Sequence, residues 1–414
     1  MRLRGDRTAR RTGGLSAPAI TKSGPQTRAL IVGGGIGGLA TALALARNGM
    51  SVTVLERSAF ADETGAGIQL GPNATRALAE LGVLDAIEAV AFRPDVLRLF
   101  DGLSGASLAS VPLGRIAEER YGAPYLTLHR ADLHASLLAA CRADGRIELR
   151  NGFDVTEAET LAKPVIVRGA DGTQVEGSNL VAADGLWSRL RQRVPPDADL
   201  RFSGATAWRA LLPRGELPAP FDAPEVGLWL GPRAHLVHYP VRGGRDLNIV
   251  AVVEGGNAKQ GWSRRAEPDV LLPSFDRWAK PAKALLEMVK TWRCWSLFRL
   301  KPLPSWTEGR MALLGDAAHP VLPYLAQGAA LAIEDAVTLA ASLKACGGDA
   351  LVAFPRYQSL RVDRAARVQA QAARFGRLYH LRGPAAFARN FLLGRRRPES
   401  LLRSFDWLYG DANR

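Results

Sequence analysis

The feature that most constrains the fold is a glycine-rich turn between a buried strand and a helix. The aliphatic run at 28–32 predicts a parallel strand, and Gly33, Gly35 and Gly38 follow it with the spacing G-x-G-x-x-G. An alanine- and leucine-rich helix is expected to continue over 39–47. The first glycine permits the turn, the second lets a pyrophosphate approach the backbone, and the third lets the helix pack against the strand.

A carboxylate at the end of the next strand completes this pattern. The strand predicted at 51–55 ends at Glu56, eighteen residues after Gly38. An acid in that position accepts hydrogen bonds from an adenosine ribose, and the phosphates lie at the helix N-terminus, where free N–H groups favour anions. A glycine-rich connection that only packs tightly would leave the acid unexplained. The segment therefore predicts a dinucleotide-binding unit, and at this point FAD and NAD both remain open.

The net charge of +14, taken alone, suggests a protein that binds nucleic acid or a membrane surface. The excess lies at the two ends of the chain, because residues 1–28 carry +6, residues 361–414 carry +8, and the part between them is neutral. Residues 1–25 lack periodic apolar positions and are expected to form a disordered basic extension instead of a targeting signal. This distribution argues against nucleic acid as a partner.

The cysteines and the hydropathy of the chain indicate the cellular compartment in which the protein is expected. Cys141, Cys294 and Cys346 lie far apart with no C-x-x-C pair, which indicates free thiols in a reducing, cytoplasmic environment and no metal cluster. The uncharged stretch 29–46 is long enough to suggest a membrane span, but the five glycines within 33–38 favour a strand, a turn and a helix. No membrane association is expected.

Two later strand ends carry aspartates. The strand predicted from 179 ends in Asp184-Gly185, and the strand that starts at 310 runs into Gly315-Asp316. Gln327-Gly328 then opens a long helix. A carboxylate at a strand end that faces a helix N-terminus suits the hydroxyl groups of a cofactor chain, and the helix N-terminus favours an electron-rich ring. These two motifs extend the cofactor site predicted from the first turn.

Helical segments dominate the C-terminal part. Helices are expected at about 331–345 and from Pro355 to about 379, and His319, which precedes a proline, is expected to be structural. Several arginines recur at roughly helical spacing, which predicts a solvated basic face, a surface that attracts anions, or a subunit contact. These arginines are Arg361, Arg364, Arg367 and Arg374.

The three motifs, in this order, resemble those of the flavoprotein aromatic hydroxylases, the single-component FAD-dependent monooxygenases, over about residues 28–410. Segments 65–73, 128–133, 323–328 and 406–410 resemble the salicylate, 3-hydroxybenzoate and 6-hydroxynicotinate hydroxylases in particular. The resemblance implies a mixed α/β (α+β) fold, with a Rossmann-like FAD-binding domain, an antiparallel-sheet substrate domain and C-terminal helices. The expected parts are a disordered extension at 1–25, an FAD-binding domain at 26–200 with a substrate-side insertion near 85–125, the substrate domain at 201–304, a return to the FAD-binding domain at 305–360, and a helical tail at 361–414.

The resemblance also implies the reaction. NADH or NADPH would reduce FAD, O2 would add to the reduced flavin as a C4a-hydroperoxide, and its distal oxygen would pass to an electron-rich ring with loss of water. The implied substrate is a small aromatic acid or phenol, no metal is required, and the enzyme would be a monomer or homodimer. An epoxidase or reductase of the same fold that acts on a non-aromatic substrate is one alternative. A basic nucleic-acid-binding protein is a more distant one.

Cofactor contacts follow from the resemblance residue by residue. Glu56 would hold the adenosine ribose, Arg130 would contact the FAD chain, and Asp316 would bind the ribityl chain. Asp184 would support the groove for FAD and NAD(P)H, although an Asp-Gly pair is often only a turn. A surface ion pair is the alternative for Arg130. The predicted cofactor-binding set is Gly33, Gly35, Gly37, Gly38, Glu56, Arg57, Arg130, Asp184, Gly315, Asp316, Gln327 and Gly328.

The pattern changes between residues 205 and 254. Short strands are predicted at 206–212, 226–230, 234–241 and 247–254, and turns rather than helices separate them. A meander of this kind forms an antiparallel sheet, which would roof the flavin.

One strand of this meander carries the candidate catalytic residues. Alternate side chains face opposite sides of a sheet, so His235 and Tyr239 are expected as neighbours on one surface, whereas His238 faces the other. His235 is predicted as the general base for a ring hydroxyl and Tyr239 as an orienting group, a pairing that close relatives share. A satisfied core pair or an exposed outer face is the alternative.

Three further residues are candidates for the substrate pocket. Gln69 falls where some 6-hydroxynicotinate hydroxylases carry a histidine, which argues against that substrate. Gln327 would contact flavin or substrate, and Tyr324 is either a pocket residue or a packing residue.

Overall fold

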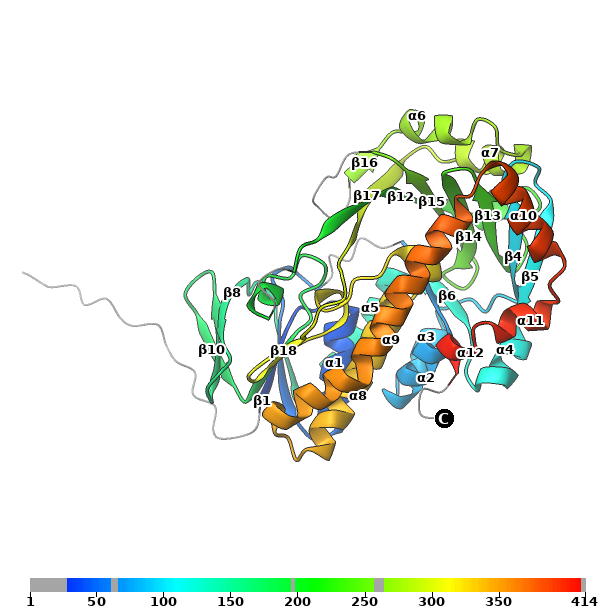
Figure 1. Cartoon of the computed structure of the whole chain (residues 1–414). Coiled ribbons are helices and arrows are strands. Elements are labelled where there is room, and N and C mark those ends of the chain that lie inside the picture. Colours follow the sequence, from blue (N-terminus) through cyan, green and yellow to red (C-terminus); the bar gives the residue numbers. More distant parts are fainter. Residues whose placement is uncertain (1–27, 61–65, 195–197, 257–263, 411–414) are drawn as a thin grey trace, which may run out of the picture.

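The computed structural model describes residues 28–60, 66–194, 198–256 and 264–410, so the predicted basic extension at 1–25 lies outside the described residues. Two large sheets organise the described part of the chain, and one long helix, α9 (Ala350–Tyr379), runs from the first sheet to the second (Figure 1). The fold is mixed α/β, as expected.

The first sheet has six strands in the order β18-β19-β11-β1-β2-β7, and all its pairings are parallel except that of β18 with β19. Its strands are short aliphatic runs because helices cover one face and a small antiparallel sheet covers the other, which leaves no solvated side for polar residues. The strands are β1 (Arg28–Val32), β2 (Ser51–Leu55), β7 (Ile147–Arg150), β11 (Asn179–Ala182), β18 (Thr307–Glu308) and β19 (Met311–Leu313).

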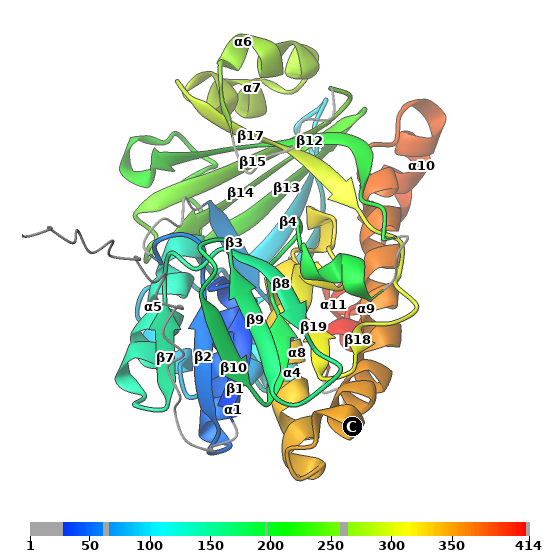
Figure 2. The same ribbon diagram turned by 90° about the vertical axis from the view of Figure 1, so that its left-hand side faces the viewer.

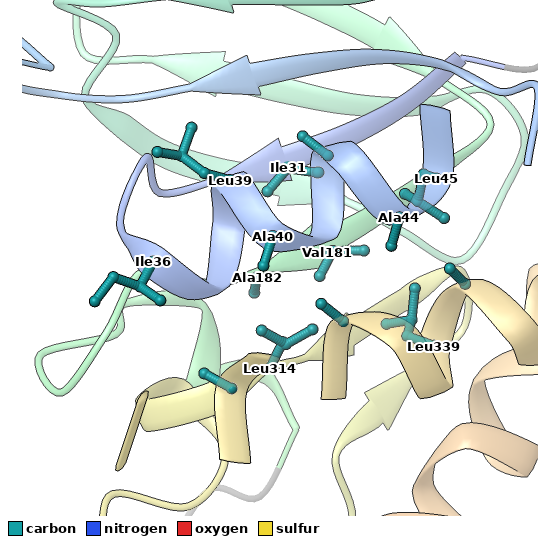
Figure 3. Close-up of a cluster of buried hydrophobic side chains, with 14 of the residues drawn as sticks. Ile31, Ile36, Leu39, Ala40, Ala44, Leu45, Val181, Ala182, Leu314 and Leu339 are labelled. Atoms are coloured by element: carbon teal, nitrogen blue, oxygen red, sulfur yellow. The ribbon is translucent and has the colours of Figure 1, made fainter. Parts of the chain in front are cut away.

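Helix α1 (Ile36–Arg47) lies between this sheet and α8 (Gly328–Ala345), and α5 (Arg130–Ala143) packs beside it. Figure 3 shows Leu39 and Leu45 of α1 in one cluster of buried side chains with Leu314, which follows β19, and Leu339 of α8. Ala40 and Ala44 let the two helices approach closely. Burial on all sides explains the long uncharged run at 29–46, and within the described residues no helix is long and apolar enough to cross a membrane.

Between β7 and β11 the chain makes an excursion into a small antiparallel sheet, which faces the viewer in Figure 2. Its strands are β8 (Val155–Glu159), β9 (Val165–Gly169) and β10 (Gln174–Gly177). A two-stranded sheet, β3 (Gly67–Leu70) with β6 (Leu126–His129), connects the two halves. The short helices α2 (Pro72–Glu80), α3 (Leu84–Glu88) and α4 (Gly114–Tyr121) lie in the same part of the chain.

The second sheet has eight strands in the order β16-β17-β12-β15-β14-β13-β4-β5. The predicted meander is its centre, and the pairings of β12, β13, β14 and β15 are antiparallel as expected. β4 departs from that pattern because it pairs with β13 in parallel. The strands are β4 (Val96–Asp101), β5 (Ser107–Pro112), β12 (Arg201–Pro213), β13 (Glu225–Gly231), β14 (Ala234–Val241), β15 (Asp246–Glu254), β16 (Arg264–Ala266) and β17 (Trp292–Arg299).

Helices α6 (Pro268–Leu271) and α7 (Lys280–Glu287) cover the outer face of this sheet, where Trp229 and Trp292 are buried. The other face looks toward the six-stranded sheet and α9. The chain closes with α10 (Gly383–Gly394), α11 (Pro398–Arg403) and α12 (Asp406–Tyr409).

Two expectations for the C-terminal helices are wrong. Helix α9 begins at Ala350, because the Asp349 side chain accepts a hydrogen bond of 3.1 Å from the N–H of Leu351, and Pro355 lies inside the helix. Arg361 does not lie on a solvated basic face, because it is 4% exposed and pairs with Asp335 and Glu334 of α8 at 2.7 Å.

The other arginines of this helix differ among themselves. Arg364 also pairs with Glu334, at 2.6 Å, and donates to the carbonyl oxygens of Trp407 and Leu408, which ties α12 to α8. Arg367 stacks on the Trp407 ring at 4.3 Å, and Arg374 is exposed. The four arginines at helical spacing therefore include both structural residues and surface residues.

Candidate active site

The cofactor motifs meet at one edge of the six-stranded sheet. Glu56 follows β2, Gly33 follows β1, Asp184 follows β11, and the Gly315–Ala317 turn follows β19, so all four lie at the carboxyl ends of neighbouring parallel strands. The chain order reverses at β1, which lies between β2 and β11. Open α/β sheets bind their ligands at such a point.

The first and third glycines of the turn have the steric roles predicted for them. Gly33 has φ +106°, and a Cβ there would lie 2.3 Å from the carbonyl oxygen of Ala183. A Cβ on Gly38 would lie 1.9 Å from the Gly33 oxygen, whereas one on Gly35 would meet no described atom within 4 Å. The first and third glycines thus permit close packing, and the second faces open space at the N-terminus of α1. Gly37 permits helix packing, because its Cβ would lie 3.0 Å from Leu314.

Glu56 joins the ends of β1 and β2. Its Oε2 accepts a hydrogen bond of 2.6 Å from the N–H of Gly34, and its Oε1 accepts from the backbone and hydroxyl of Ser58. These bonds hold the carboxylate at the strand end, where further lone pairs can accept ribose hydroxyls. Arg57 lies beside it with an exposed side chain.

Asp184 has one oxygen engaged and one without a partner. Its Oδ2 accepts from the N–H groups of Arg189 and Leu190, at 3.0 and 3.3 Å, which is the turn role. Its Oδ1 is buried without a hydrogen-bond partner among the described residues, and burial raises the pKa of the carboxyl group. An orphaned buried acceptor at this edge fits a ligand that brings a donor.

Asp316 and Arg130 face each other across the site. The Asp316 carboxylate accepts no hydrogen bond from the described residues, and burial raises its pKa against the opposing charges of His319 and Arg130. Burial lowers the pKa of Arg130 to about 10, although the Asp316 charge opposes this shift. Arg130 is half-buried, and its charge and that of Asp316 act on each other.

Buried polar contacts fix the turn that carries Asp316. Gly315 has φ +61°, and its N–H donates to Asp335 Oδ2, which also lies 2.6 Å from Nε2 of His319. Although burial would raise the pKa of Asp335, the His319 and Arg361 charges lower it to about 2. His319 is thus structural, as expected.

The N-terminus of α8 lies next to Asp316. A Cβ on Gly328 would be 3.9 Å from Asp316 Oδ1, and the first turn of α8 carries no acid, so its positive dipole end is uncompensated there. Gln327 precedes it, is 1% exposed, and accepts a hydrogen bond of 2.9 Å from Nδ2 of Asn73. Ala326 holds a left-handed backbone, with φ +53°, that turns the chain into the helix.

Strand β14 presents its side chains as the alternation predicts. His238 packs on the outer face, with Phe221 and Trp229 at ring distances of 5.0 and 6.5 Å, and burial lowers its pKa to about 3. His235 lies on the inner face and is 3% exposed. Its ring contacts Tyr324 and Tyr379, at 5.4 and 5.3 Å between centroids.

His235 and Tyr239 share the inner face, but the expectation that they are neighbours is wrong. Three residues of the strand lie between them, which corresponds to about 13 Å, and Val237 is the one of the three that shares their face. Tyr239 instead packs on β3, where a Cβ on Gly67 would lie 2.7 Å from its ring, and burial raises its pKa to about 12. Gln69 of β3 accepts a hydrogen bond of 2.7 Å from Tyr125. His235 and Tyr239 thus lie at the two ends of a stretch of the inner face that is long enough for an aromatic ring.

Arg209 is a residue that sequence reasoning missed. The strand register aligns it with Val250 of β15, which pairs with Val237 of β14, so Arg209 faces the stretch between His235 and Tyr239. Its Nε is buried without a hydrogen-bond partner among the described residues, and the guanidinium stacks on Trp295 at 5.3 Å. The sequence offered one signal for this role, because Arg209 is a charged residue within an otherwise apolar predicted strand.

Tyr324 serves mainly as a packing residue. A Cβ on Gly376 of α9 would lie 2.7 Å from its ring, and its carbonyl accepts a hydrogen bond of 3.2 Å from the Tyr379 hydroxyl. Of the two roles considered for Tyr324, these contacts correspond to packing, although the ring also borders His235.

Comparison with known proteins decides the family. A family model for an FAD binding domain matches residues 26–372. The chain is 40% identical over 384 residues to 3-hydroxybenzoate 6-hydroxylase 1 of Aquipseudomonas alcaligenes, which covers 92% of this chain and 97% of that protein. The chain belongs to the FAD-dependent aromatic hydroxylases.

Solved structures agree with this assignment. HpxO of Klebsiella pneumoniae, crystallised with FAD and uric acid, superposes on this hydroxylase with a TM-score of 0.82 and 27% identity, over 93% of this chain and 97% of that chain. A salicylate hydroxylase in a substrate complex gives a TM-score of 0.80 and 26% identity, over 94% and 96% of the chains. Both superpositions therefore agree with membership of the FAD-dependent aromatic hydroxylases.

The residues present fit FAD. Gly35 faces open space, Asp184 offers an orphaned buried oxygen, and Asp316 offers a carboxylate without a hydrogen bond from the described residues. Two helix N-termini, those of α1 and α8, lie at the same sheet edge. Acceptors for hydroxyl groups and dipoles for anionic groups are the two demands of a ribityl-pyrophosphate chain.

Proposed function

We propose that this hydroxylase uses NADH or NADPH and O2 to add a hydroxyl group to a small hydroxylated aromatic acid, with 3-hydroxybenzoate as the first candidate. The observation that carries the proposal is the inner face of β14 and β12, which presents a base, a phenol and a cation that pairs with no carboxylate among the described residues. A relative named for 3-hydroxybenzoate and a structural neighbour named for salicylate support the same substrate class.

Bound FAD supplies the oxygen-transfer chemistry, and the chain positions the cofactor. Gly35 would admit the pyrophosphate to the N-terminus of α1, and Glu56 would accept the ribose hydroxyls. Asp316 would bind the ribityl hydroxyls, with Arg130 supporting its charge. The N-terminus of α8 at Gln327 and Gly328 would stabilise negative charge on the ring system.

The substrate contacts follow from the inner face. His235 would accept the proton of the ring hydroxyl, which makes the ring electron-rich at the moment of attack. Tyr239, whose raised pKa keeps it protonated at neutral pH, would donate a hydrogen bond that orients the ring. Arg209 would bind the carboxylate, because a half-buried guanidinium with no carboxylate partner in the described part of the chain favours an anion. Gln69 and Gln327 would border the ring on the β3 and α8 sides.

The test is NAD(P)H oxidation and O2 uptake by the purified, FAD-loaded protein over a panel of hydroxybenzoates, with product identification by chromatography. We expect a ring-hydroxylated product with at least one carboxylated phenol, and much slower product formation with the decarboxylated ring at the same concentration. Stimulation only by non-aromatic compounds would assign the epoxidase or reductase chemistry instead. A protein without a flavin spectrum after incubation with FAD would contradict the cofactor assignment.

A further inference from the structure

The candidate base belongs to a chain of three titratable side chains that leads to the surface. His235 Nδ1 lies 2.8 Å from His380 Nε2, and His380 Nδ1 lies 3.0 Å from Glu254 Oε1. His235 is 3% exposed, the His380 side chain is 3% exposed, and the Glu254 side chain is 42% exposed. We call these three residues the histidine relay. It runs from the inner face of β14 past the end of α9 to the end of β15.

The hydrogen bonds determine which nitrogen of His235 is basic. A carboxylate only accepts, so His380 Nδ1 must carry the proton that it donates to Glu254. In neutral His380 the other nitrogen, Nε2, then accepts, and His235 Nδ1 must be the donor. Neutral His235 therefore keeps its lone pair on Nε2, which makes no hydrogen bond within the described residues. This is the tautomer that a general base requires.

Other charged groups also face the relay. Arg233 lies 3.6 Å from the second oxygen of Glu254, and its N–H donates to the carbonyl of His380. Arg389 of α10 acts electrostatically on His380, and Tyr324 acts similarly with Glu254. Burial lowers the pKa of both histidines, most strongly at His235, where the His380 charge adds to the effect. A proton is therefore costly to hold on His235 and is stabilised nearer Glu254.

We propose that His380 and Glu254 are positioning residues that conduct the substrate proton from His235 to solvent and return it to the product, an inference that rests on the proposed function. The ring hydroxyl gives its proton to His235 Nε2, and the O–H electron pair stays on the ring oxygen. The Nδ1 proton of His235 moves to His380 Nε2, and the Nδ1 proton of His380 moves to Glu254 and then to water.

The same three transfers in reverse complete the cycle. The phenolic product again carries a proton on its original oxygen, so one proton comes back along the relay and each histidine regains its first tautomer. No oxidant or reductant takes part in these transfers.

The test is proton release on binding of 3-hydroxybenzoate to the oxidised, FAD-loaded enzyme, measured by stopped flow with a pH-indicator dye at neutral pH. Glu254→Gln keeps an acceptor for His380 but removes the charge, and His380→Gln keeps an acceptor for His235 but cannot pass a proton on. We expect both variants to slow proton release on the order of tenfold or more, with the substrate Kd and the flavin spectrum unchanged. A larger solvent deuterium isotope effect should accompany the slower release.

Asp246→Asn is the matched control, because Asp246 also lies on β15 and pairs with an arginine, Arg242, at the far end of that strand. It should release protons as the unmodified enzyme does. Unchanged release in Glu254→Gln and His380→Gln, in an enzyme that hydroxylates its substrate, would overturn the relay and leave the proposed function intact. Absence of both proton release and hydroxylation with the whole phenol panel in the unmodified enzyme would overturn both.

Discussion

Asp335 of α8 accepts a hydrogen bond of 2.7 Å from Nε of Arg361 of α9, and both side chains are buried. The same carboxylate accepts from the Gly315 N–H and lies 2.6 Å from His319, so the ion pair also supports the turn that carries Asp316. Helix packing and the cofactor edge therefore depend on one buried charge pair.

Arg361→Met should destabilise the protein by about 3–5 kcal/mol, because it leaves the Asp335 and Glu334 charges without their shared buried partner. Chemical denaturation of the FAD-loaded enzyme measures this loss. Arg374→Met is the control, since Arg374 is exposed on the same helix. Equal stability of the two variants would show that the pair contributes nothing.

Gly38→Ala should abolish FAD binding. The new Cβ would lie 1.9 Å from the Gly33 carbonyl oxygen, so the first turn of α1 must move away from the strand that it packs against. Flavin fluorescence titration measures the affinity. Gly49→Ala changes a glycine in the same unit where a Cβ would meet no described atom within 4 Å, although φ of +84° still strains it. It should bind FAD while losing some stability.

His235→Ala should lower kcat by about 10²–10⁴-fold while FAD remains bound, because a positioned base is lost. His238→Ala should leave kcat within a few-fold, since that ring packs on the opposite face of β14 with Phe221 and Trp229. Steady-state kinetics with 3-hydroxybenzoate compares the two variants. The reverse pattern would show that the assignment of strand faces to function is wrong.

Arg209→Met should raise KM for a carboxylated phenol by about tenfold or more, since a charge-assisted bond is worth roughly 1.5–3 kcal/mol. Phenol itself, which lacks the carboxylate, should be affected far less. Arg201→Met, on an exposed residue of the same strand, is the control. A uniform change for both substrates would assign Arg209 to packing on Trp295 instead.

Stability should fall in acid partly through His238. Its folded pKa of about 3 lies below the ordinary value near 6.5, so between these values the unfolded chain binds a proton that the folded chain does not. His238→Leu removes this contribution. Its stability relative to the unmodified enzyme should therefore rise by about 1.4 kcal/mol per pH unit as the pH falls from 6 to 4. Denaturation curves with a constant difference over this range would contradict the shift.

Local patterns predicted where several residues of the candidate cofactor site lie. The turn after β1, the acid after β2 and the opposite faces of His235 and His238 follow from short-range spacing, because backbone geometry alone imposes them. The strands at 234–241 and 247–254 and their antiparallel pairing also follow from local patterns.

Contacts between distant elements could not be predicted in this way. His380 reaches His235 only because α9 ends beside β14, 145 residues farther along the chain. Arg361 looked like a surface residue because its partners, Asp335 and Glu334, lie on another helix. The sequence offers two possible starts for α9, one with Asp349 as the N-cap and one with Pro355 in the first turn. The spacing of apolar residues along the helix does not distinguish between them.

The strand order of the six-stranded sheet has a consequence for synthesis of the protein. β1 and β2 leave the ribosome early, but β19, which completes the cofactor edge beside β11, begins only at Met311 of 414 residues. Until then the nascent chain carries β11 with one open edge, which can pair with other chains. The candidate FAD site is thus complete only after most of the polypeptide has emerged.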